Sequence, residues 1–118
     1  MKYVCLVYGE ETLFDTLTKE GSAKLDAESL AYDRSLDAAG HLIVAEALQS
    51  VRKSRTVRRR KGKTIVTGGP FAETKEQLLG FVMIEAKDIE EATKIAAGIP
   101  LAELGSVEVR AVYDVPGS

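Results

Sequence analysis

Apolar and polar positions alternate along the chain in a pattern that predicts strands separated by two helices. Residues 2–8, KYVCLVY, are apolar on both faces, so we expect a central strand that is covered on both sides. Residues 10–21 are polar and predict an irregular connection. The stretch 55–68 predicts a hairpin that turns near Lys61-Gly62. Three further strands are expected, at residues 41–48, 79–86 and 106–115.

Two segments repeat apolar residues at helical spacing. The first runs from about Ser22 to Ala39, and Gly40 is placed to end it in the left-handed conformation. In the second, DIEEATKIAAGIP, we expect Asp88 to cap the helix, with Glu91 as its reciprocal partner. The predicted inward stripes are Leu25, Tyr32, Leu36 and Ala39 in the first helix, and Ile89, Ala92, Ile95, Ala96 and Ile99 in the second.

The order of these elements, β-α-β-hairpin-β-α-β, predicts an α+β fold with a ferredoxin-like antiparallel sheet and both main helices on one face. The other face of the sheet would then be apolar and uncovered. A symmetric homodimer is the simplest way to bury it. The 118 residues suit a single domain, 1–118.

Composition narrows the class of protein. The N-terminal apolar run spans six residues, Tyr3 to Tyr8, which is too short for a signal peptide or a membrane span, so we expect a cytoplasmic protein. We expect no metal, because His41 and Cys5 lie in different strands and make no zinc site. We also expect no cofactor. The glycine pair at 68–69 lacks the lysine and the downstream spacing of a phosphate-binding P-loop.

Charge is distributed unevenly along the sequence. Eight basic residues and no acid lie between Arg52 and Lys63, and the remainder of the chain carries a net charge of −10. This basic segment can steer an anionic ligand or dock on the acidic surface of a second copy. Nucleic-acid binding is less favoured, because residues 48–70 contain no aromatic side chain that could stack on bases.

The loop Gly68-Gly69-Pro70-Phe71 has two interpretations. As a tight turn, its glycines supply positive φ angles and Phe71 becomes a core or dimer anchor. As a ligand site, its backbone N–H groups form a cradle for an anion. Both interpretations stay open on the sequence alone.

The charged residues that follow also have two interpretations. In a ligand site, Lys75 and Thr74 would contact the ligand, and Glu73 or Glu76 would act as a general base. In a structural loop, the same side chains would form pairs that pin the loop across a dimer.

Three further side chains are candidates for chemistry. Glu46 lies in the apolar run LIVAEAL, where an acid needs a partner or a raised pKa unless the strand is an edge facing solvent. Tyr8 ends the first strand and offers a hydroxyl to a ligand. His41 follows Gly40 and would titrate near neutral pH, or serve as a charge partner at the helix C-terminus.

The stretches VTGGPFAETKEQLLGF and IPLAELGSVEVRAV resemble the YCII-related family, in its DGPF-domain branch. The resemblance extends over residues 2 to 113. It implies a ferredoxin-like α+β fold that dimerises face to face into an α+β barrel. The related superfamily includes small enzymes, similar to muconolactone isomerases and monooxygenases, that use the pocket between helix and sheet. Members of this branch are often encoded beside extracytoplasmic-function sigma factors, which implies a regulatory setting.

The sequence departs from the family pattern at two positions. Gly69 stands where the branch has the aspartate of its DGPF motif. Other YCII proteins carry a histidine on the first helix, and the matching position here is near Ser29. A His-Asp catalytic pair of that kind is therefore missing both members.

Three functions remain open. The first is a small dimeric barrel enzyme that acts on an organic molecule, with Glu46 and the 68–76 loop at its pocket. The second is a non-catalytic module that senses a ligand or binds a protein partner. The third is nucleic-acid binding through residues 52–63.

Overall fold

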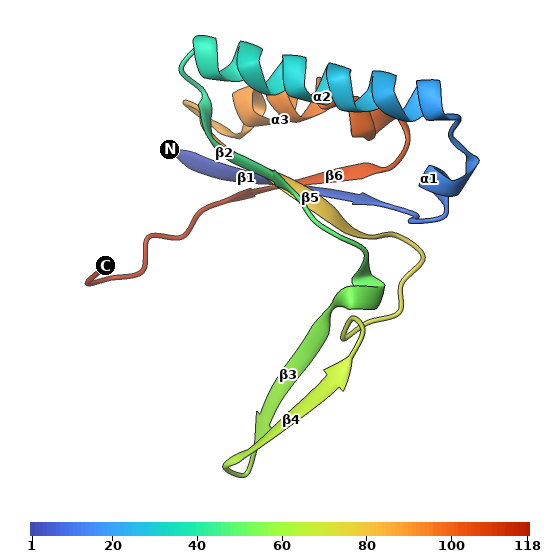
Figure 1. Cartoon of the computed structure of the whole chain (residues 1–118). Helices are drawn as coiled ribbons and strands as arrows, with labels where there is room; N and C mark the ends of the chain where they lie inside the picture. The colour runs from blue at the N-terminus through green and yellow to red at the C-terminus, as the bar shows by residue number, and fades with distance from the viewer.

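The structure is a computed structural model that describes residues 1–118, and it has two layers and a projecting arm (Figure 1). Four strands form one antiparallel sheet in the order β2-β5-β1-β6. They are β1 Lys2–Gly9, β2 Leu42–Ala47, β5 Gln77–Glu85 and β6 Ser106–Ala111. The two long helices, α2 Lys19–Ala38 and α3 Ile89–Ala97, cover the same face of this sheet. The predicted ferredoxin-like α+β architecture is therefore confirmed.

The arm is a hairpin of β3 Arg55–Arg60 and β4 Lys63–Gly68, which form a separate two-stranded sheet. Lys61 and Gly62 both have positive φ, 51° and 76°, as a two-residue hairpin turn requires, so the predicted turn is confirmed. Three short helices complete the chain: α1 Leu13–Thr16, η1 Val51–Lys53 and η2 Pro100–Glu103. None of the helices combines the length and apolar character needed to cross a bilayer.

Some predicted boundaries are wrong for identifiable reasons. The first long helix begins at Lys19, three residues before the predicted start at Ser22. The Thr18 hydroxyl caps the helix there, because it accepts a hydrogen bond from the Gly21 N–H at 2.9 Å. Residues 10–21 include a helical turn, α1, instead of a wholly irregular connection. The last strand ends at Ala111, which pairs with Tyr3 of β1. β1 is its only partner and begins at Lys2, so the end of the predicted strand 106–115 has no strand to pair with.

The core lies between the sheet and the helices. Tyr3, Cys5 and Val7 of β1 point into it, together with Val82 and Ile84 of β5. The helices contribute the buried residues Leu36, Ala92, Ile95 and Ala96, and Ile99 follows α3, as the stripes predict. Two predicted stripe residues are exposed: Ala39 caps the end of α2, and Ile89 starts α3 beyond the end of β5, where 43% of its surface is accessible.

The opposite face of the sheet carries an apolar surface that the chain does not cover. Val4, Leu6 and Tyr8 alternate with the core residues of β1 and are half-buried. The register places Leu6 beside Phe81 and Val4 beside Met83, so these side chains form one patch. We call this surface the open face. β1 is central, as expected, but the prediction that it is covered on both sides is wrong for a single chain.

Candidate functional site

Two adjoining hollows lie where β1 runs into α1. One has a volume of about 360 Å³ and the other about 430 Å³, and both are lined by Glu10 and Thr12. The first is also lined by Leu13, Thr16, Glu76 and Leu104, and the second by Glu11, Val51, Arg52, Thr74, Lys75 and Gln77. The predicted residues Thr74, Lys75 and Glu76 are thus brought together at one rim of the molecule.

The loop that supplies these residues is held by its own hydrogen bonds. The Thr74 hydroxyl donates to the Glu76 carbonyl at 2.6 Å, and the Gln77 side-chain amide donates to the Thr74 carbonyl at 3.0 Å. The Gly69 N–H donates to the Ser54 carbonyl at 2.9 Å, and the Gly69 carbonyl accepts from the Thr56 hydroxyl at 2.8 Å. The backbone of Gly69 is fully engaged, so it adds no free N–H to an anion cradle.

The φ of +90° at Gly69 favours the tight-turn interpretation of this loop. Gly68 is the last residue of β4, and Pro70 follows Gly69 in the loop. Phe71 is 79% exposed, so it anchors nothing within the chain and is available only to a partner.

Several charges at the rim are already engaged. The Lys75 ammonium lies 3.2 Å from a Glu10 carboxylate oxygen in an exposed ion pair. The Glu11 carboxylate accepts from the Ser50 hydroxyl at 3.1 Å and from the Val51 N–H at 3.3 Å, which ties it to η1. Glu73 is exposed to solvent. The rim therefore presents both signs of charge and no unbalanced positive well for an anion.

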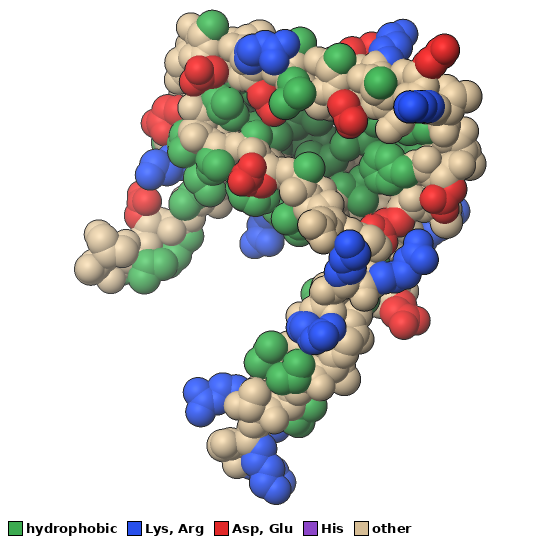
Figure 2. All heavy atoms as spheres, in the orientation of Figure 1, with side chains coloured by type: hydrophobic (Ala, Val, Ile, Leu, Met, Phe, Trp, Pro, Cys, Tyr) green, Lys and Arg blue, Asp and Glu red, His purple; other side chains and the backbone are tan.

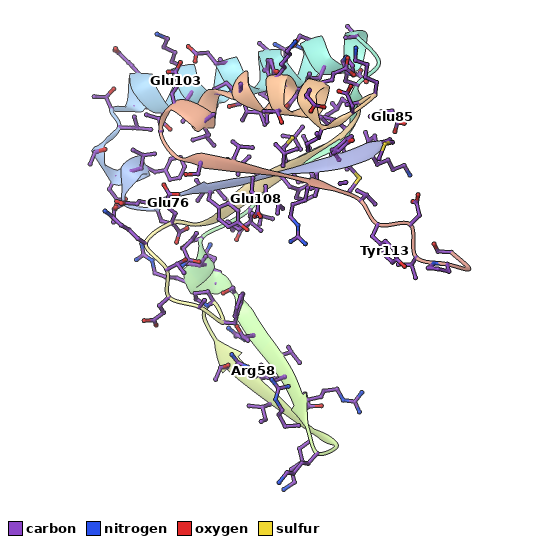
Figure 3. All side chains as sticks on the ribbon, turned by 180° about the vertical axis from the view of Figure 1, so that it is seen from behind. Arg58, Glu76, Glu85, Glu103, Glu108 and Tyr113 are labelled. Atoms are coloured by element: carbon purple, nitrogen blue, oxygen red, sulfur yellow. The ribbon has the colours of Figure 1, made fainter.

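The predicted residues Tyr8 and Glu46 lie on the open face instead. Tyr8 pairs with Ser106, whose hydroxyl donates to a Glu76 carboxylate oxygen at 2.9 Å. Glu46 lies opposite Phe81 on β2, which is an edge strand, and its side chain is exposed. The edge-strand interpretation of Glu46 is thus the one that the structure supports. Figure 3 shows Glu108 on this same face, away from the helices.

His41 lies at the far end of the sheet. Its Nδ1 is 2.8 Å from the Glu85 carbonyl, at the junction between α2 and β2. Glu76 immediately precedes β5 and Glu85 ends it, and the nine residues of β5 span about 27 Å. His41 and Glu76 therefore cannot act on one small substrate within a single chain.

A third region lies between α2 and the sheet, where the family resemblance implies a pocket. Helix α2 is 20 residues long but buries only Leu36, so much of its length stands clear of the sheet. Figure 2 shows hydrophobic side chains lining a recess between α2 and the strands below it. The strands are lined by small residues on the helix side of this edge, namely Ala45, Ala47 and Gly80. Small residues beneath a lifted helix leave room that the core does not fill.

Asp33 is a titratable residue at the edge of the buried stripe of α2. It follows Ser29 by one turn of α2, and both are half-buried beside the stripe of Leu25 and Leu36. The Asp33 carboxylate forms no ion pair with the chain. Burial raises its pKa above the ordinary value of 3.8. A ligand with a cationic or hydrogen-bond-donating group can supply the partner that this half-buried carboxylate lacks.

The pH dependence of stability tests this description of Asp33. Because its pKa is higher in the folded than in the unfolded state, its ionisation destabilises the fold as the pH rises through the folded pKa. We expect Asp33→Asn to raise the free energy of unfolding at pH 7, and this gain to vanish below pH 3.8. Urea denaturation from pH 3 to 8 measures it. The matched control is Asp26→Asn, an exposed acid of α2 two turns before Asp33, and equal profiles for both variants would contradict the assignment.

Two other groups have raised pKa values without being candidates. Cys5 is fully buried, and burial raises the pKa of its thiol to about 11, so the reactive thiolate does not form at neutral pH. Burial raises the pKa of Tyr32 as well, and the Cys5 charge adds to the effect. The Tyr32 hydroxyl donates to the Ile95 carbonyl at 2.6 Å and joins α2 to α3. No group of three His, Cys, Asp or Glu side chains is placed to hold a metal ion.

Comparison with known proteins gives a consistent result. The sequence model of the YCII-related domain matches residues 1–116. An uncharacterized protein of Rhizobium meliloti (strain 1021) is 38% identical to the chain over 112 residues, which cover 93% of this chain and 90% of that protein.

Proposed function

Because this chain belongs to the YCII-related domain family, we propose that it binds a small organic molecule between α2 and the sheet, as one half of a symmetric dimer. The observation that carries the proposal is Asp33, a half-buried carboxylate with no ion-pair partner in the chain, on a helix that stands clear of the sheet. We also assign the chain to the DGPF-type branch, on its segment GGPFAETKE.

The lining indicates the class of ligand. Apolar side chains in the recess favour a ligand with an apolar body (Figure 2). The unpaired Asp33 carboxylate favours a group that donates hydrogen bonds, with an amine the strongest choice because it also carries the opposite charge. An anionic ligand is disfavoured, since it would approach a carboxylate without a neutralising cation beside it.

Surface area supports the dimer. The single chain exposes 8483 Å², whereas a compact protein of 12.8 kDa exposes about 6,300 Å². Its radius of gyration is 16.3 Å, against about 13 to 14 Å for a compact chain of this length. The excess surface of about 2,200 Å² per chain is in the range that permanent homodimers bury. The open face, with Val4, Leu6, Phe81 and Met83, is the apolar part of that surface.

A ligand screen tests the binding proposal. We expect small aliphatic and aromatic amines to raise the melting temperature, and carboxylates of the same size to leave it unchanged. Asp33→Asn should weaken amine binding by about 10- to 100-fold, because it removes a charge-assisted hydrogen bond of about 1.5 to 3 kcal/mol. Isothermal titration calorimetry measures the affinity, with Asp26→Asn as the control on the same helix. Selective binding of the carboxylates, or equal affinities for the two variants, would rule out Asp33 as the ligand contact.

A further inference from the structure

The β3–β4 hairpin has no surface of its own chain to pack on. It stands away from both layers, and Figure 3 shows Arg58 on it, well clear of the helices and the sheet. Its apolar side chains are exposed, with 61% of Val57 and 56% of Val66 accessible, and these two residues form a cross-strand pair. An isolated two-stranded hairpin is only marginally stable in water. An ordered hairpin with an exposed apolar pair therefore indicates a partner surface.

The positive charge of the hairpin indicates that its partner surface is acidic. The segment Arg52–Lys63 carries eight bases and no acid, and none of these bases forms an ion pair within the chain. The rest of the same chain has a net charge of −10. A second copy thus offers the acidic surface that each hairpin lacks.

We propose that the hairpin is an arm that reaches across the dimer and lies against the acidic helical layer of the second copy. This inference rests on the dimer proposed above. Each arm strand has six residues and spans about 20 Å. Two facing sheets lie about 10 Å apart, and a helix is about 10 Å thick. An arm that leaves one sheet on its open side is therefore long enough to pass the partner's sheet and reach its helices.

Helix α2 is the expected contact on the partner. It carries five acids against three bases, the largest number of acids on any element. Four of its acids are exposed: Glu20, Asp26, Glu28 and Asp37. The arm places Arg59, Arg60, Lys61 and Lys63 at its tip, so the most basic part of one copy would meet the most acidic helix of the other. The contact is reciprocal, as two-fold symmetry requires.

Zero-length cross-linking of mixed dimers tests the arm directly. Equal amounts of ¹⁵N-labelled and unlabelled chain are exchanged, treated with a carbodiimide that joins amines to carboxylates, and analysed by mass spectrometry. We expect mixed-isotope links from Lys61 or Lys63 to acids of α2. A dimer with no inter-copy link from the arm would overturn the inference and leave the dimer itself in place. A chain that stays monomeric in sedimentation would instead overturn the dimer, and the arm contact with it.

Charge reversal supplies a second readout. We expect Arg58→Glu with Arg60→Glu to raise the dimer dissociation constant by about tenfold and to reduce its dependence on salt. The matched control is Lys87→Glu with Lys94→Glu at exposed positions near and on α3, which reverses the same number of charges. An unchanged dissociation constant for the arm variant, with loss of binding to a fluorescent DNA oligonucleotide, would overturn the inference in favour of a nucleic-acid contact.

Discussion

Leu6→Asp should turn the dimer into monomers. Leu6 lies at the centre of the open face, between Phe81 of β5 and Glu108 of β6. In the proposed dimer an aspartate there puts a charge among apolar side chains, which costs several kcal/mol unless the charge is paired, and Arg110 on the same face pairs with Val4 instead of with Leu6. Glu108 lies directly beside it, and like charges in a cross-strand pair repel. We expect the dimer dissociation constant to rise more than about 100-fold in sedimentation equilibrium, which corresponds to about 2.7 kcal/mol.

The control for this variant is Leu30→Asp. Leu30 is 58% exposed on α2 and lies outside the open face, so the same substitution there introduces the same charge without entering that face. Among the acids of α2, an added negative charge would not repel the partner's basic arm. Circular dichroism should show that both variants remain folded, because the single chain leaves Leu6 only half-buried. If Leu6→Asp and Leu30→Asp have equal dissociation constants, the open face is not the interface.

Among the glycines within the strands, Gly80 should be the one at which a change to alanine destabilises the fold most. A Cβ at Gly80 would lie 2.6 Å from the Glu46 carbonyl oxygen and 3.2 Å from the Ala47 Cα. Both are backbone atoms of β2, which can yield only if the edge strand moves away from β5. We expect the free energy of unfolding to fall by about 1 to 3 kcal/mol, the usual cost of overpacking, in urea denaturation.

Gly68→Ala provides the matched comparison. Gly68 ends β4, its added Cβ would meet no atom within 4 Å, and its φ is not in the left-handed region. There the substitution should be neutral or stabilising by up to about 1 kcal/mol, since it restricts the unfolded chain. A similar loss of stability in both variants would mean that Gly80 is not a close contact between β2 and β5.

The fold was largely predictable because each element carries a local signal. The hairpin was predicted from Lys61-Gly62 and the second long helix from Asp88, whose side chain accepts the Glu91 N–H at 2.9 Å. The predictions that were wrong concern features that depend on contacts between elements distant in the sequence. The last strand was predicted too long because the sequence of 106–115 does not reveal where β1 begins, and the Glu91 carboxylate bonds the Lys87 N–H instead of that of Asp88.

The candidate site was predicted less well, since a site depends on which elements meet. The charged loop was recognised, and the structure brings Thr74, Lys75 and Glu76 to one rim, but it places Glu46 on the open face and His41 at the other end of β5. Asp33 was missed. Its only signal in the sequence is its position, one helical turn after Ser29 and next to the apolar stripe of α2. Periodicity alone predicts that an acid at such a position is exposed to solvent.

The burial of Cys5 has a practical consequence for measuring the arm. It is the only cysteine in the chain, it has no accessible surface, and its thiol has a pKa of about 11. Maleimide reagents at neutral pH attack accessible thiolates, so the natural chain should be inert to them. A cysteine introduced at Lys61 would then be the sole labelling position, and a spin label there would report the distance between the two arm tips in solution without any other residue being removed.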